Sequence, residues 1–181
     1  MVNWLVALVL LGVPASVQAN FEVLSGRTKI NSNAIVTNAE LDLELSDAVA
    51  EALDQGIEID IVAEIRLYRI RPYIWDEEIA RWRIDYRLKH HDLSTTYVVR
   101  DDRSNELETF VTLREAMDFI ADFNVSLPVV TETLPQTDDG YRVAFSIYLD
   151  RGSLPPPLKL IADFSPNWHL GSRWKQWSVE Q

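Results

Sequence analysis

Apolar and polar residues alternate along much of the chain, which is the pattern of strands with one buried and one exposed face. In Ala39 to Leu45 the leucines take one face and the acidic residues take the other. The same period predicts further strands at 57–67, 82–89 and 141–149, a hairpin of 95–100 with 106–111, and a last strand at 174–179. The alternation changes phase near Tyr68, which predicts a bulge or bend there.

Helices are predicted to be few and short. Ser46 is placed to cap one helix that ends before Gly56, and Thr112 with Glu115 has the spacing of a capping box that begins a second. Asp76 is expected to cap a single turn. Many strands and two short helical connections predict a mainly β fold, a two-sheet antiparallel sandwich.

The N-terminus has the composition of an export signal. Residues 1–19 carry no charged side chain, and Trp4 to Val13 form an apolar run followed by Pro14. Small residues at Val17 and Ala19 fit cleavage after Ala19, so we predict a signal peptide at 1–19 and one periplasmic domain at 20–181. Retention of this run as an anchor is the alternative, but the run is short for a membrane span. No stable membrane span is expected after processing.

The composition of the chain argues against some classes of function. The chain has a formal net charge of −11 and no cysteine. Nucleic-acid binding is disfavoured because it depends on clustered Lys and Arg that displace counterions from phosphates. The absence of cysteine excludes lipidation and disulfides, and an exported acidic domain without disulfides favours a periplasmic location over a harsher extracellular one.

The candidate chemistry is sparse, and we predict no catalytic, cofactor or metal residues. His90 and His91 with Asp92 are candidate metal ligands, but adjacent side chains of an extended chain point to opposite faces, so a solvated turn is the favoured interpretation. The acidic runs 76–78 and 101–102 suit a helix start and a hairpin tip. No Gly-x-Ser-x-Gly motif is present.

A run of basic residues is the strongest hint of a recognition surface. It comprises Arg66, Arg69, Arg71, Arg81, Arg83, Arg87 and Lys89, flanked by Trp75 and Trp82. From it we predict an interaction face made of Arg69, Arg71, Trp75, Arg81 and Trp82, because arginine and tryptophan dominate binding surfaces. The alternative is a solvated sheet face on which these arginines pair with Glu58, Asp60, Glu64 and Asp85.

Several motifs resemble a family of exported proteobacterial proteins classed as a domain of unknown function. They are 69–76 (RIRPYIWD) and 154–158 (LPPPL) followed by Trp168, Ser172 and Trp174, together with 45–47, 52–56 and 93–97. The resemblance covers nearly the whole mature chain. It implies a gene that is often found beside a sensor kinase of the nitrogen-regulation type, and it implies no activity.

Three hypotheses for function remain. The first is a non-enzymatic periplasmic binding or protein-interaction domain, accessory to an envelope or sensor protein. The second is a carrier of a small apolar or lipid ligand held between two sheets. The third is a metal-independent hydrolase that uses an acidic pair.

Overall fold

A computed structural model describes residues 20–31, 34–129, 134 and 140–180, which form a mainly β domain. The predicted signal peptide at 1–19 lies outside the described residues. The strands are β1 (Phe21–Asn31), β2 (Ala34–Leu43), β3 (Ile59–Arg69), β4 (Glu77–His91), β5 (Thr96–Asp101), β6 (Glu106–Phe110), β7 (Asp122–Pro128), β8 (Tyr141–Leu149) and β9 (Lys175–Glu180). The helices are α1 (Asp47–Asp54), α2 (Leu113–Ala121) and α3 (Pro156–Phe164), with 3₁₀ turns η2 (Arg151–Ser153) and η3 (Pro166–Trp168).

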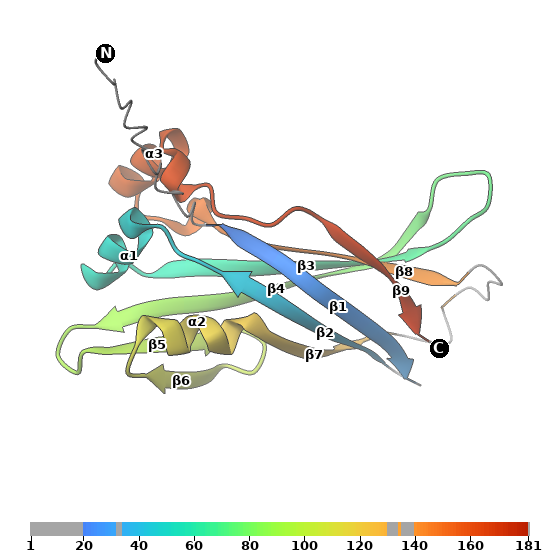
Figure 1. Cartoon of the computed structure of the whole chain (residues 1–181), viewed down its shortest axis with the longest axis horizontal. Coiled ribbons are helices and arrows are strands. Elements are labelled where there is room, and N and C mark those ends of the chain that lie inside the picture. The colour runs from blue at the N-terminus through green and yellow to red at the C-terminus, as the bar shows by residue number, and fades with distance from the viewer. Residues whose placement is uncertain (1–19, 32–33, 130–133, 135–139, 181) are drawn as a thin grey trace, which may run out of the picture.

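The strands form one curled sheet in the order β6-β5-β4-β3-β8-β9-β1-β2-β7, so the predicted two-sheet sandwich is wrong (Figure 1). All neighbours are antiparallel except β1 and β9, which run parallel and make the sheet mixed. Alternation shows that a strand has one apolar face. It does not distinguish two facing sheets from one sheet rolled into a half-barrel, because both bury one face of every strand.

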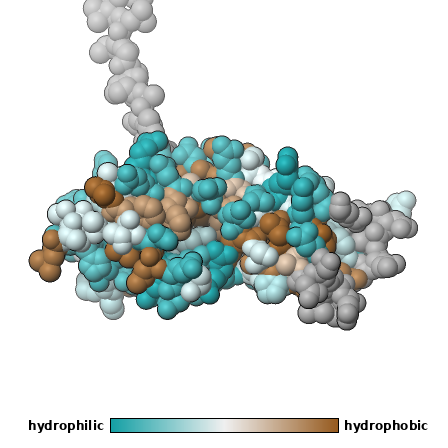
Figure 2. Space-filling view, turned by 90° about the horizontal axis from the view of Figure 1, so that it is seen from below, coloured by the Kyte–Doolittle hydropathy of each residue, from teal (hydrophilic) through white to brown (hydrophobic). Residues whose placement is uncertain are grey.

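The core fills the concave side of this half-barrel. Phe21, Phe123 and Phe145 are fully buried there, and the rings of Phe123 and Phe145 meet edge to face at 5.0 Å. Helix α2 contacts β5 and β6 near one end of the strand order and β2 and β7 at the other. It therefore spans the open side of the half-barrel. Seen from below, that side is mainly hydrophilic, with apolar side chains in separate patches (Figure 2).

Most of the predicted strands are confirmed. Strand β8 has the bounds predicted for it, β5 and β6 form the predicted hairpin, and β9 occupies the predicted C-terminal segment. The predicted irregularity near Tyr68 is present, because the pairing of β3 with β4 shifts register between Leu67 and Tyr68.

Both predicted helix starts are confirmed. The Ser46 side chain accepts a hydrogen bond from the Val49 amide at the start of α1, and Gly56 has the left-handed φ of 82° after its end. Thr112 and Glu115 form the complete capping box of α2. The predicted turn at Asp76 is wrong, since β4 begins at the next residue, and a third helix, α3, follows Pro155.

Strand β9, near the end of the chain, joins the two halves of the sheet. It pairs with β8 through Phe145 and Lys175, and with β1 through Thr28 and Val179. The sheet is therefore continuous only when the C-terminal strand is in place.

Candidate functional site

The five residues of the predicted interaction face do not share one surface. Arg81 and Trp82 are consecutive on β4, so Trp82 packs against the core while Arg81 points to the convex side. Arg69 lies two positions after the buried Leu67, on the side of Trp82. Arg71 and Trp75 come together in the hairpin loop between β3 and β4, and Arg69 and Arg71 share the Glu77 carboxylate.

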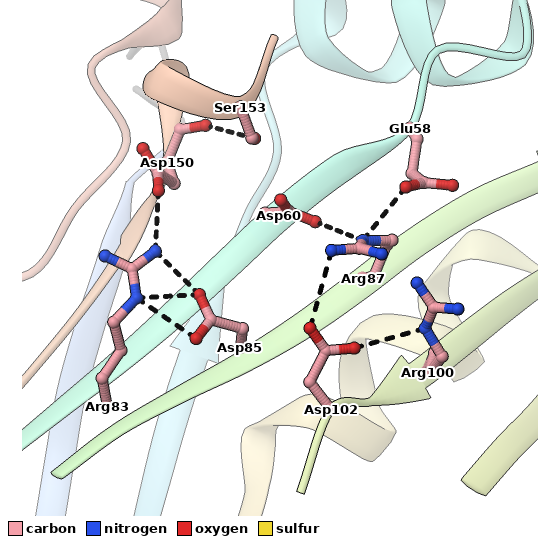
Figure 3. A network of polar contacts seen from close by, with 9 residues as sticks. All are labelled: Glu58, Asp60, Arg83, Asp85, Arg87, Arg100, Asp102, Asp150 and Ser153. Carbon is pink, nitrogen blue, oxygen red and sulfur yellow. Dashed lines mark hydrogen bonds and ion pairs between the residues drawn. The ribbon is translucent and has the colours of Figure 1, made fainter. Parts of the chain in front are cut away.

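The convex side of β3, β4 and β8, which we call the outer face, carries a dense set of ion pairs. Arg83 contacts Asp85 at 2.8 Å and Asp150 at 2.7 Å, so it links β4 to the end of β8 (Figure 3). Arg87 contacts Glu58 and Asp60, each at 3.0 Å. Arg66 lies 2.6 Å from Glu64 and stacks over the Trp174 ring at 4.3 Å.

These contacts support the paired interpretation of the basic run. Each of its six arginines has a carboxylate within 4.0 Å; the pairs not yet named are Arg69 with Glu77, Arg71 with Glu77, and Arg81 with Glu78. The four acids predicted as partners, Glu58, Asp60, Glu64 and Asp85, all take part. The outer face is thus a compensated surface rather than a basic stripe.

Ion pairing also sets the protonation of the carboxylates on this surface. Burial alone raises the pKa of Asp150, but hydrogen bonds from the Arg83 guanidinium and the Gly152 amide outweigh it, and the pKa lies below its usual value. The Arg81 guanidinium lowers the pKa of Glu78 in the same way. Both side chains are therefore held ionised, the state that accepts hydrogen bonds from arginine.

The lowered pKa of Asp150 predicts that this ion pair is lost in acid. Because the folded pKa is below the unfolded one, the stabilisation is complete above the unfolded pKa of about 4 and disappears as the pH falls through the folded pKa. We expect Asp150→Asn to flatten the fall in the free energy of unfolding below about pH 4, measured by urea titration over a pH series. Glu22→Gln, at an exposed position of β1, serves as the control. An unchanged pH profile in the Asp150 variant would contradict the assignment.

The hairpin tip, residues 71–76 between β3 and β4, is the most exposed apolar feature of the described chain. Tyr73, Ile74 and Trp75 are consecutive and exposed, and Trp75 retains 90% of its accessible surface. The loop projects at the end of the molecule opposite α3 (Figure 1). Large apolar side chains on a projecting loop are typical of recognition elements.

The shape of the hairpin tip is fixed by its own polar contacts. The Arg71 guanidinium donates to the Trp75 carbonyl oxygen from Nε at 3.0 Å and from Nη2 at 2.8 Å. The Asp76 carboxylate accepts from the Arg71 amide at 3.4 Å and pairs with Arg142 on β8. Tyr73 adopts a left-handed φ of 71°, which is costly for a residue with a side chain. The tip is therefore preorganised in an exposed and strained conformation.

A groove of about 600 Å³ opens between the end of β2, α1 and α2. Its floor is apolar, with the buried Leu41, Leu43 and Met117. Its rim is acidic and carries Asp42, Glu44, Asp47 and Asp118, with Arg114 as the one basic residue among those that line it. The acidic rim makes this groove unfavourable for anionic ligands.

The histidines do not converge on a metal position. His90 and His91 are the last two residues of β4, and the His90 ring stacks on Tyr97 with a centroid distance of 4.7 Å. Its Nδ1 lies 3.5 Å from the Asp92 carboxylate. Within the described ranges no group of three His, Cys, Asp or Glu side chains is arranged to hold a metal ion.

None of the helices in the described part of the chain has the length and apolar character to cross a bilayer.

These features define a mainly β domain of one curled sheet, with a compensated outer face and a preorganised apolar hairpin tip. The chain belongs to the family described as a domain of unknown function (DUF4390), which it matches over residues 18–178. The predicted resemblance to a domain of unknown function is thereby confirmed, whereas the gene neighbourhood beside a sensor kinase stays a prediction. Comparison with curated proteins and with solved structures found no match.

Proposed function

We propose that the chain works in the periplasm as a non-enzymatic protein-interaction domain that recognises an envelope protein through the hairpin tip. The observation that carries this proposal is the exposure of Tyr73, Ile74 and Trp75 on a loop held by Arg71. A fixed loop loses little conformational freedom when it binds, so more of its contact energy appears as affinity.

The residue types in the tip match those that dominate protein interfaces. Tryptophan and tyrosine contribute large apolar areas, and the carbonyl of Trp75 is already satisfied by Arg71 and needs no partner. Of the predicted interaction face, this proposal keeps Trp75 as a contact residue and Arg71 as a positioning residue. The gene neighbourhood implied by the family resemblance makes the exported part of a sensor kinase the first partner to test.

Photo-crosslinking in intact cells tests this function directly. A photoreactive phenylalanine analogue at Tyr73 is expected to crosslink one envelope protein. The same analogue at Leu93, equally exposed at 105% in the turn after β4, is the matched control. We expect Trp75→Ala to weaken the crosslink from position 73 strongly, because an aromatic anchor contributes about 2 kcal/mol or more, roughly 30-fold in affinity.

The positioning role of Arg71 is tested by measuring the affinity of the purified partner, in addition to crosslinking. Arg71→Lys cannot donate two hydrogen bonds in the fixed geometry of a guanidinium, so it is expected to weaken binding while the circular dichroism spectrum stays unchanged. Equal crosslinking from positions 73 and 93 would contradict the proposal. So would crosslinking of Trp75→Ala at the level of the wild type.

A further inference from the structure

Helix α3 has an apolar face that points away from the protein. Leu160, Ile161 and Phe164 are at positions i, i+1 and i+4, so they share one side of the helix, and all three are exposed, Phe164 by 87%. Ala162 on the opposite side is buried. A helix with an apolar outer face is typical of segments that lie in a membrane interface.

The opposite side of α3 is seated firmly on the domain. The Arg151 side chain lies 3.6 Å from the Asp163 carboxylate and donates to the Ala162 carbonyl oxygen at 3.5 Å. The partly buried Leu158 packs against the core. The apolar outer face is therefore presented in a fixed orientation.

The first described residue lies at the same end of the molecule as α3. The Asn20 carbonyl accepts a hydrogen bond from the Glu44 amide at 3.1 Å. Two residues later the Ser46 hydroxyl donates to the Asn167 carbonyl at 2.7 Å, in the turn η3 that directly follows α3. Figure 1 shows the start of β1, α1 and α3 together at one end, with the hairpin tip at the other.

The sequence before Asn20 supplies the argument for a lipid surface. Residues 1–19 contain no charged side chain and include the apolar run Trp4 to Val13, which favours a bilayer over water. The six residues from Pro14 to Ala19 span at most about 20 Å even when fully extended. Whenever the apolar run is in a bilayer, Asn20 and the neighbouring α3 are confined close to its surface.

We propose that, as long as the N-terminal apolar run stays attached to the domain, before cleavage or if it is retained as an anchor, the apolar outer face of α3 lies on the bilayer that holds this run. Leu160, Ile161 and Phe164 enter the boundary between headgroups and acyl chains, and the exposed Lys159 reaches the phosphates. The hairpin tip then points away from the lipid, toward a partner farther from the membrane. This surface is independent of the tip, so it goes beyond the function proposed above.

The absence of cysteine makes a depth measurement clean. The full chain, reconstituted in vesicles of phosphatidylethanolamine and phosphatidylglycerol, would carry a single Ile161→Cys labelled with a nitrobenzoxadiazole fluorophore. Nitroxide lipids are expected to quench this probe severalfold more strongly than the same probe at Tyr73→Cys. Phe164→Asp or Leu160→Asp in the Ile161→Cys background should reduce the quenching, and circular dichroism checks the fold.

Three outcomes would overturn the proposal. They are equal quenching at both positions, stronger quenching at position 73, and a blue-shifted probe at 161 without quenching, which would mean that protein rather than lipid covers α3. Quenching at position 73 would also count against the proposed function, because it would place the hairpin tip on lipid. Loss of quenching at position 161 with no quenching at 73 leaves the crosslink from Tyr73 unaffected, so the failures of the two proposals can be told apart.

Discussion

Replacing Phe145 with alanine is expected to lower the free energy of unfolding by about 3–5 kcal/mol, the largest effect of any single substitution considered. Phe145 on β8 is fully buried and contacts Phe123 on β7 at 5.0 Å and Trp177 on β9 at 6.1 Å between ring centroids. Strands β7 and β8 are not neighbours in the sheet. The ring therefore holds the two limbs of the half-barrel together across its concave side.

Urea titration of the purified domain measures this effect. Leu107→Ala, at an exposed position of β6, is the control and should change the free energy of unfolding by no more than about 0.5 kcal/mol. Phe145→Leu removes less volume and should fall between the two, which keeps the test usable if the alanine variant does not fold. A loss of less than about 1 kcal/mol for Phe145→Ala would show that the limbs do not depend on this contact.

Gly26→Ala is expected to destabilise the protein by about 1–3 kcal/mol through overpacking. A Cβ atom on Gly26 would lie 2.4 Å from Cζ3 and Cη2 of Trp177. The Trp177 ring is held in place, because its Nε1 donates to the buried Thr28 hydroxyl at 2.9 Å. Relief of the clash therefore breaks a hydrogen bond or moves β1 away from β9.

A double-mutant cycle with Trp177→Leu isolates this clash. If the added methyl group and the indole compete for the same space, Gly26→Ala should cost much less in the Trp177→Leu background than in the wild type. Additive losses would mean that the clash is absorbed elsewhere in the sheet.

The strands could be predicted where the alternation is unbroken, and were missed where it is not. Strand β1 was missed because Ser25 and Gly26 interrupt its apolar positions, and it buries the polar Thr28. Strand β7 follows α2 without a break, so the apolar Phe123 fits the spacing of one more helical position. Helix α3 was not predicted because consecutive prolines before Leu158 are typical of linkers, although proline also suits the first turn of a helix.

The curl of the sheet could not be predicted from the sequence. The two halves of the sheet are joined by the parallel pairing of Thr28 with Val179, and no local pattern marks partners so far apart in the chain. Part of the candidate site, by contrast, could have been predicted correctly. The sequence already held enough to separate Arg81 from Trp82, because consecutive strand residues face opposite ways.

The sequence also contained an indication of the hairpin tip. Tyr73, Ile74 and Trp75 follow Pro72 between two predicted strands, where a turn would usually be polar. Their exposure depends on the way Arg71 closes the loop, which only the three-dimensional arrangement shows.

The central position of β9 has a consequence for biogenesis. The strand that bridges the two halves of the sheet is synthesised after the other eight described strands, so a nascent chain that stops short of β9 holds two incomplete halves. The final topology cannot form until β9 has been made, and loss of this strand would leave the edges of β1 and β8 open to pairing with other chains.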